Sequence, residues 1–221
     1  MLGSFHGDES FPFRWEPTDG CVWRGGGGRA ESFPLDGRVA LVAGGSGGIG
    51  VRVCGAPAGV GARVAIVGRS EEGLRAAREA VEAAGSEALV LLGDMAREGE
   101  ADGVLAATME AWGRLDVLVN AIGSGAGTAL TPAERYPEPE WGRILDLNLR
   151  SAFLVPKAAA RAMIAGGRGG RILNLSPVRR QLGIDSDFSA YVAAKSPERA
   201  QAPARDGELP STGSPTTPPG S

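Results

Sequence analysis

Cysteine and histidine are scarce in this chain, and their scarcity excludes several kinds of site. The 221 residues include two cysteines, Cys21 and Cys54, and one histidine, His6. Two isolated cysteines are too few for a disulfide framework, a zinc site or a CxxC redox pair, so we interpret both as inert thiols. His6 has no partner nearby in the sequence. We therefore expect no metal site and no catalytic histidine.

Long apolar runs and a surplus of positive charge are also missing. No run approaches the roughly 20 apolar residues that span a bilayer, and the N-terminus lacks the features of a signal peptide. A formal net charge of -3 provides no basic footprint for a nucleic-acid backbone. These absences predict a cytoplasmic protein that binds neither membranes nor nucleic acid.

Three regions differ in composition. Residues 1–34 have neither helical nor strand periodicity, although they hold half of the aromatic residues, and we expect an irregular or disordered extension. Residues 196–221 are dominated by Pro, Ser, Thr and Gly, which predicts a disordered tail. Between them, residues 35–195 alternate short aliphatic runs with stretches of helical spacing, as expected for one folded domain.

The folded region predicts an α/β fold. A clear helix is expected over 71–84, with Ser70 as its N-cap and Gly85 just past its end. Short aliphatic runs separated by helices predict a parallel sheet wound on both faces, of the Rossmann type. The five expected strands cover 39–43, 64–67, 88–92, 117–119 and 172–175.

A glycine cluster follows the first of these strands. Glycine permits a tight turn there and lets the backbone approach a pyrophosphate, while the next helix offers free N–H groups to the anion. The spacing of Gly44, Gly48 and Gly50 resembles the TGxxxGIG signature of the short-chain dehydrogenase/reductase family, whose members bind NAD or NADP on a single Rossmann domain. The resemblance implies that the cofactor is bound by Gly44, Ser46, Gly48, Ile49 and Gly50.

The sequence departs from that signature in two ways. Ala43 replaces the usual threonine, which removes a hydroxyl that braces the turn. Gly55, Pro57 and Gly59 interrupt the following helix, and a proline inside a helix costs about 3 kcal/mol. We therefore expect this helix to be short or kinked.

Residues after the next strands bear on the choice of cofactor. Arg69 stands where NAD-preferring proteins usually have an acid, and an arginine suits the 2′-phosphate of NADP. NADP is therefore the expected cofactor, with NAD possible, although Arg69 can also be read as a solvated loop residue. In the family pattern, Asp94 resembles the residue that meets the adenine amino group, and Asn120 opens an NNAG-like element whose second Asn is Ala121 here.

Tyr191 and Lys195 stand four residues apart and draw on scarce residue types. The 23 basic residues include only two lysines, and the chain has only two tyrosines. Moving a hydride to or from a carbon that bears oxygen requires a proton donor or acceptor, and a cation close to a phenol favours the phenolate. The pair resembles the family's YxxxK element, which implies that Tyr191 is the general acid/base and Lys195 its helper.

Two further catalytic residues are implied by the resemblance. Asn148 matches an asparagine that helps to hold a water reaching the lysine, although a buried or capping asparagine is the alternative. The family serine that polarises the substrate aligns with Pro177, and Ser176 takes its place only if the loop shifts by one residue.

The resemblance covers residues 35–195, so we expect a single Rossmann domain that lacks its last strands. A truncated or frame-shifted reading of the gene is our hypothesis for the tail. An oligomer is expected for the family but doubtful for this chain, because the sheet edge is left unpaired.

The leading hypothesis is an enzyme that interconverts a secondary alcohol and a ketone, acting on a small-molecule carbonyl or alcohol. The alternative is a catalytically impaired dinucleotide-binding remnant or sensor. A third reading, an interaction protein, has no specific motif behind it.

Overall fold

The structure is a computed structural model that describes residues 13–16, 20–23, 34–123, 133–175 and 189–195. The predictions for Ser176, Pro177 and the tail 196–221 lie outside these residues, as does most of the N-terminal extension. Within that extension the structure describes two strands, β1 (Phe13–Glu16) and β2 (Gly20–Trp23), paired antiparallel. No strand is predicted here from the sequence, because neither segment is an aliphatic run like those of the main sheet.

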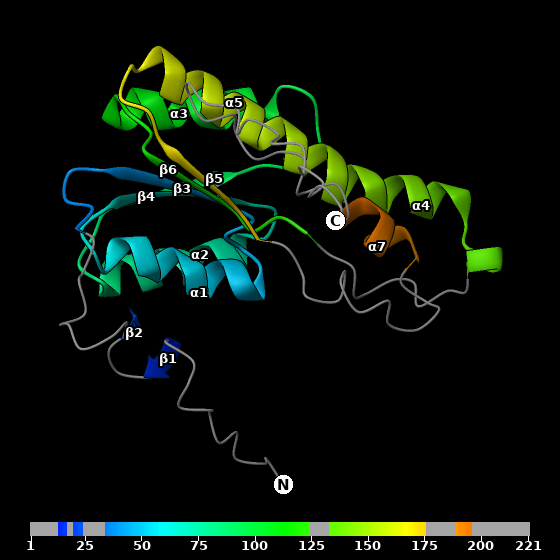
Figure 1. The fold of residues 1–221 in the computed structure, drawn as a ribbon, viewed down its shortest axis with the longest axis horizontal. Helices are drawn as coiled ribbons and strands as arrows, with labels where there is room; N and C mark the ends of the chain where they lie inside the picture. Colours follow the sequence, from blue (N-terminus) through cyan, green and yellow to red (C-terminus); the bar gives the residue numbers. More distant parts are fainter. Residues whose placement is uncertain (1–12, 17–19, 24–33, 124–132, 176–188, 196–221) are drawn as a thin grey trace, which may run out of the picture.

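A five-stranded parallel sheet forms the centre of the fold (Figure 1). The strands lie in the order β5-β4-β3-β6-β7. The chain therefore moves outward from β3 to β5, then returns to the other side of β3 for β6 and β7. All five predicted strands are confirmed to within one residue at each end: β3 (Val39–Ala43), β4 (Arg63–Gly68), β5 (Ala88–Leu92), β6 (Val117–Asn120) and β7 (Arg171–Asn174).

Helices cover both faces of the sheet, which confirms the predicted Rossmann-type architecture (Figure 1). On one face lie α1 (Gly48–Ala58) and α2 (Glu71–Ala83). On the other lie α3 (Glu100–Trp112) and α5 (Ser151–Ala165). A short 3-10 turn, η1 (Ala133–Arg135), precedes α4 (Glu138–Leu145), which continues through the π-helical turn η2 (Asp146–Arg150) into α5. The last described helix is α7 (Ser189–Lys195).

Strand β3 is buried on both faces and divides the core into two layers. Val39, Leu41 and Ala43 face the layer that α3 and α5 complete. Val42 faces the second layer, to which α1 and α2 contribute Cys54 and Leu74. A continuous apolar strand is what a parallel sheet with helices on both faces requires.

The helix expected after β4 is confirmed. Ser70 caps α2, and its Oγ accepts a hydrogen bond from the Gly73 N–H at 3.2 Å. Gly85, just past the end, has φ +83°, a backbone conformation that favours glycine. Helix α1 continues through Gly55 and Pro57 and ends at Ala58, so Pro57 lies in its last turn and does not prevent a helix of 11 residues.

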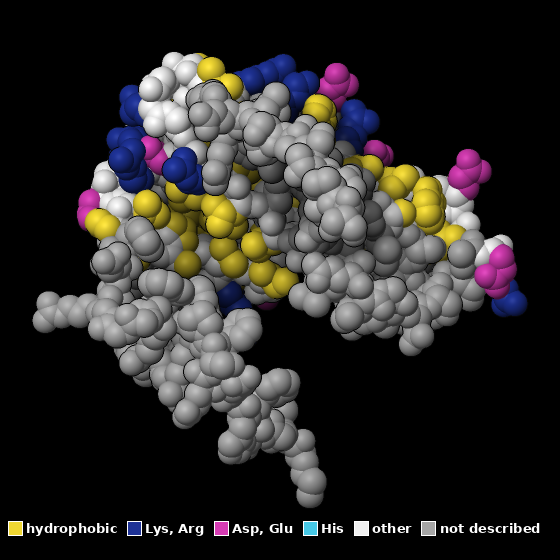
Figure 2. Space-filling model, viewed as in Figure 1, with side chains coloured by type: hydrophobic (Ala, Val, Ile, Leu, Met, Phe, Trp, Pro, Cys, Tyr) yellow, Lys and Arg dark blue, Asp and Glu magenta, His cyan; other side chains and the backbone are white. Residues whose placement is uncertain are grey.

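Strand β7 is an edge strand within the described sheet. It pairs with β6 on one side, and its Leu173 is 47% exposed. Figure 2 shows hydrophobic side chains open over this part of the molecule. In the part of the chain that the structure describes, no helix is both long and apolar enough to cross a membrane.

A buried carboxylate joins the amino ends of β3 and β6. Asp116 accepts hydrogen bonds from Arg114 Nε at 2.7 Å, Val39 N at 2.9 Å and Arg38 NH1 at 3.1 Å. Burial alone would disfavour the ionised form, but the hydrogen bonds from Arg114, Val39 and Arg38 outweigh it and hold the pKa of Asp116 below its ordinary value. The ionised carboxylate therefore stabilises the folded state.

Replacement of Asp116 by asparagine is expected to lower the free energy of unfolding at pH 7 by about 1–3 kcal/mol, because charged hydrogen bonds are lost. A lowered pKa contributes stability above the unfolded-state value near 4, and this contribution disappears as the pH falls through the folded-state pKa. The difference between wild type and Asp116→Asn, measured by urea unfolding, should therefore shrink below about pH 4. Glu82→Gln, which breaks an exposed pair with Arg78, is the control and should change stability little. A constant difference from pH 7 to pH 3 would contradict this assignment.

Candidate nucleotide-binding site

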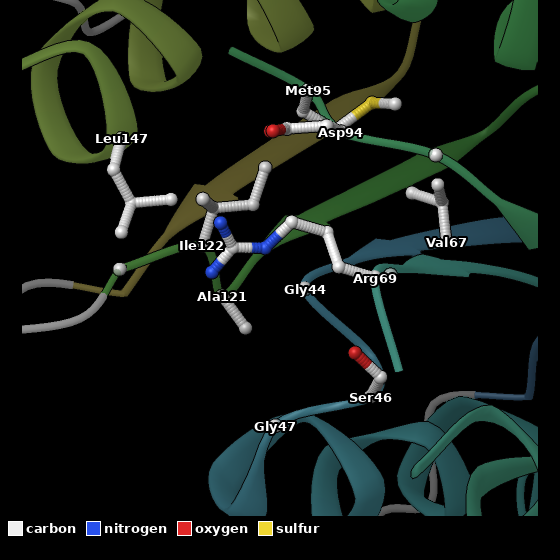
Figure 3. Close-up of a pocket in the computed structure, with 13 residues that line it drawn as sticks. Gly44, Ser46, Gly47, Val67, Arg69, Asp94, Met95, Ala121, Ile122 and Leu147 are labelled. Atoms are coloured by element: carbon white, nitrogen blue, oxygen red, sulfur yellow. The ribbon is translucent and has the colours of Figure 1, made fainter. Parts of the chain in front are cut away.

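A cavity lies at the carboxyl ends of β3, β4, β5 and β6 (Figure 3). The strand order reverses between β3 and β6, and ligands of open α/β sheets bind at such a switch point. The loops after the four strands supply most of the lining, and η2 adds one residue. The residues that line it are Gly44, Ser46, Gly47, Val67, Gly68, Arg69, Gly93, Asp94, Met95, Ala121, Ile122, Gly123 and Leu147.

Three glycines are sterically required in the turn after β3. Gly44 has φ +82°, and a Cβ there would lie 2.8 Å from the Ala121 backbone carbon. A Cβ on Gly45 would lie 2.3 Å from Ile66 Cγ2, and one on Gly50 would lie 2.1 Å from the Gly44 carbonyl oxygen. The turn therefore packs tightly against α1 and the residues that follow β6, and it lines the cavity through Gly44, Ser46 and Gly47.

The amino end of α1 follows directly. Gly47 is its N-cap, with extended backbone and no side-chain hydrogen bond to the helix. A Cβ on Gly48 would meet nothing within 4 Å, and Ile49 is 68% exposed. The expected strand, turn and helix are thus present, and the unsatisfied N–H groups at a helix amino end favour an anion.

Ser46 links this turn to the next strand. Its Oγ accepts from the Ser70 N–H at 3.5 Å. A Cβ on Gly68 would lie 2.2 Å from that Oγ, and one on Gly73 would lie 2.1 Å from the Ser46 carbonyl oxygen. Gly68 and Gly73 therefore let the glycine turn pack onto the end of β4 and the start of α2, a role that the sequence pattern did not reveal.

Arg69 and Asp94, two of the residues predicted from the sequence to bind the cofactor, both line the cavity. Figure 3 shows the Arg69 side chain extending from the end of β4 across the cavity toward Ile122. Asp94 follows β5, and its Oδ1 accepts from the Ala96 N–H at 3.2 Å. Among the described residues, Arg69 has no ion pair.

Asn120 lies beneath the cavity wall and does not line it. Its side chain is buried, accepts from the Ile122 N–H at 3.3 Å and donates to Asn174 Oδ1 at 3.1 Å. Its carbonyl oxygen accepts from the Leu175 N–H at 2.9 Å. The residue expected to bind the cofactor thus braces the wall segment 121–123 and ties β6 to β7.

The residues predicted for proton transfer lie on elements that pack together. Tyr191 and Lys195 are both on α7, which contacts α4 and η2. Tyr191 is partly buried against Ile144, Ala190 and Ala194. The Lys195 side chain and the whole of Ser176 lie outside what the structure describes.

Asn148 is on η2 and fully buried, and its Nδ2 donates to the Ile144 carbonyl at 2.9 Å. Ser151 Oγ likewise donates to the Leu147 carbonyl, at 2.5 Å. These side chains satisfy carbonyls along a π turn, a feature often found at functional sites. Neither Tyr191 nor Asn148 is among the residues that line the cavity.

Sequence reasoning missed the apolar wall of the cavity, formed by Met95, Ile122 and Leu147. Met95 and Ile122 follow predicted site residues closely, so adjacency could have suggested them. Leu147 directly precedes the predicted site residue Asn148, but the sequence does not show that this helix reaches the ends of β3 to β6. Within the described residues, no group of three or more His, Cys, Asp or Glu side chains is placed to hold a metal ion.

Comparison with known proteins agrees with this geometry. The profile of the short chain dehydrogenase family matches residues 38–200. The sorbitol dehydrogenase of Cereibacter sphaeroides is 34% identical over 161 residues, which are 73% of this chain and 60% of that protein. The chain belongs to the short chain dehydrogenase family.

Two solved structures are similar in fold. NAD+-bound xylitol dehydrogenase superposes with a TM-score of 0.68 at 30% identity, covering 73% of this chain and 60% of that one. A metagenomic short-chain oxidoreductase in complex with NADP gives a TM-score of 0.67 at 34% identity, and the match covers 75% of this chain and 73% of that one. This chain thus spans about 60% of the length of the sorbitol and xylitol dehydrogenases that it matches.

Proposed function

We propose that this protein is an NAD(P)(H)-dependent oxidoreductase that interconverts a secondary alcohol and a ketone, with NADP as the preferred cofactor. Residues 35–195 form its cofactor-binding domain. The observation that carries the proposal is the cavity at the switch point of the sheet, where the glycine turn, Arg69 and Asp94 converge.

The described residues fit a nicotinamide dinucleotide. The N–H groups of Gly44, Gly45 and Gly47 already donate to protein carbonyl oxygens, so it is the amino end of α1 that offers free N–H groups to the pyrophosphate. Asp94 has a carboxylate that can accept from the adenine amino group, and Arg69 has a guanidinium that can pair with a 2′-phosphate. When bound, the cofactor supplies or accepts the hydride.

In this proposal, residues of α7 transfer the proton. The Tyr191 phenol gives a proton to the substrate oxygen in reduction and takes it back in oxidation. Lys195 is four positions along the same helix, so the two positions share a helix face, where an ammonium stabilises the phenolate. Ser176 polarises the substrate oxygen.

Asn148 acts as a positioning residue. Its side chain is fully buried on the π turn, and that turn packs against the helix of Tyr191. We infer that it holds the turn in the shape that retains a water leading to Lys195.

A catalytically impaired dinucleotide-binding protein is the second candidate. Pro177 replaces the second serine of the family pattern, and Tyr191 does not line the cavity. Cofactor binding without turnover over a broad set of ketones would favour this candidate.

Arg69→Ala is expected to weaken NADPH binding by roughly tenfold and to leave NADH binding within about twofold, because only NADPH has the 2′-phosphate. Fluorescence titration of both cofactors against wild type and variant measures this. Arg75→Ala is the matched control, because Arg75 is an exposed arginine on α2 that does not line this cavity. An unchanged ratio of the two affinities in Arg69→Ala would make Arg69 an ordinary surface residue.

A further inference from the structure

A second cavity opens beside the first and shares three lining residues with it. It has a volume of about 330 Å³, and Arg69, Asp94 and Leu147 line both cavities. Arg97, Arg143 and Asp146 line only the second one. Because Arg69 and Asp94 belong to the adenosine end of the proposed site, the second cavity continues that end.

Of the three arginines that line this cavity, one is paired with a carboxylate within the described part of the chain and two are not. Arg143 is paired with Glu140, and its Nε donates to Oε2 at 2.8 Å. Neither Arg69 nor Arg97 forms an ion pair with any carboxylate in the described part of the chain. Two guanidinium groups from different loops therefore face one cavity with their charge unpaired.

A tight turn holds Arg97 close to Asp94. The Arg97 N–H donates to the Asp94 carbonyl at 2.9 Å, and the Asp94 side chain accepts from the Ala96 N–H at 3.2 Å. The side-chain bond is an Asx turn, which fixes the backbone between the two residues. The turn thus fixes the backbone of Arg97 relative to Asp94, the residue that is proposed to meet adenine.

We propose that Arg97 is a second specificity-determining residue, which binds the phosphate monoester on the adenosine ribose of the cofactor together with Arg69. A dianion suits two unpaired guanidinium groups, and arginine binds phosphate through charge-assisted hydrogen bonds. This inference rests on the proposed function and deepens it.

The carboxylates of the cavity favour a tethered phosphate over a free one. Asp94 and Asp146 line the same space, so a free phosphate ion faces repulsion there. A phosphate attached to adenosine is delivered by the binding of the rest of the nucleotide, which raises its effective concentration at Arg97. The adenine amino group also gives Asp94 a donor.

Calorimetric titration of the full chain with simple nucleotides tests the proposal without requiring activity. The ligands are 2′,5′-ADP, 3′,5′-ADP, 5′-ADP and inorganic phosphate. Arg97→Ala should lower the affinity for 2′,5′-ADP roughly tenfold and leave the affinity for 5′-ADP within about twofold of the wild-type value. Arg97→Lys keeps the charge and should retain part of the affinity, and Arg75→Ala controls for net charge.

Several outcomes would overturn the inference. Equal affinity of wild type and Arg97→Ala for 2′,5′-ADP defeats it while leaving the cofactor proposal intact. A larger effect of Arg97→Ala on 3′,5′-ADP or on inorganic phosphate assigns Arg97 to a different anion. Failure of the wild type to bind any nucleotide defeats both this inference and the proposed function, and thermal melts would then show whether the chain is folded.

Discussion

Tyr191→Phe is expected to lower turnover by roughly a hundredfold to ten-thousandfold, the range that a general acid/base contributes, while NADPH affinity stays within about twofold. The substitution removes only the phenolic oxygen. The ring remains to pack against Ile144, Ala190 and Ala194, so the local structure should persist. Ketone reduction followed by NADPH absorbance, together with a cofactor titration, measures both quantities.

Tyr136→Phe is a matched control for this prediction. Tyr136 is the other tyrosine of the chain, and it packs edge to face on Trp141 with ring centroids 5.8 Å apart. Burial and the charge of Glu140 raise the pKa of Tyr136, so it stays a neutral phenol at pH 7. Turnover should therefore be unaffected in this variant.

Lys195→Ala should reduce both turnover and cofactor affinity, because the proposed mechanism has its ammonium stabilise the Tyr191 phenolate and the family resemblance implies that it also contacts the nicotinamide ribose. Full activity in Tyr191→Phe would remove Tyr191 from the mechanism. Absence of turnover in the wild type, with normal cofactor binding, would favour the impaired dinucleotide-binding protein instead.

Gly50→Ala is expected to destabilise the protein by about 2 kcal/mol or more, because overpacking against backbone atoms cannot be relieved by side-chain motion. The new Cβ would lie 2.1 Å from the Gly44 carbonyl oxygen and 2.8 Å from the Gly45 Cα. The glycine turn must move, so cofactor binding should be lost as well. A melting temperature lower by about 4 °C or more is the expected measurement.

Gly48→Ala is the control within the same turn. A Cβ at this position meets nothing within 4 Å, and Gly48 is the first residue of α1, where alanine favours the helix. Its melting temperature should equal or exceed that of the wild type. Equal melting temperatures for Gly50→Ala and Gly48→Ala would mean that the turn is not packed as described.

The glycine turn illustrates how far a motif can be read from sequence. The spacing of Gly44, Gly48 and Gly50 predicted a phosphate-binding turn, and the turn has the expected place between β3 and α1. The motif did not reveal that Gly44 and Gly50 are required by backbone contacts while Gly48 is not. Those contacts involve Ala121 and the folded turn itself, which come together only in three dimensions.

Asn120 and Asn148 illustrate a second limit. Both were predicted as site residues, and both side chains make hydrogen bonds to neighbouring groups. Asn120 bonds to Asn174 and to the Ile122 N–H, and Asn148 donates to the Ile144 carbonyl. Sequence spacing predicts where a residue lies along the chain. The hydrogen-bond partner of its side chain depends on the packing around it.

The sequence by itself determined the order and type of the elements from β3 to β7, the place of the glycine turn and the family. It did so because aliphatic runs, helix caps and glycine spacing are local signals, each produced within about 15 residues of chain. Only the tertiary structure decided which residues form the cavity. The strand order brings the ends of β3, β4, β5 and β6 together, and the packing of η2 over them adds Leu147. Arg97 and Arg69 share a cavity for the same reason, since neighbouring loops of a parallel sheet meet at one edge whatever their separation in sequence.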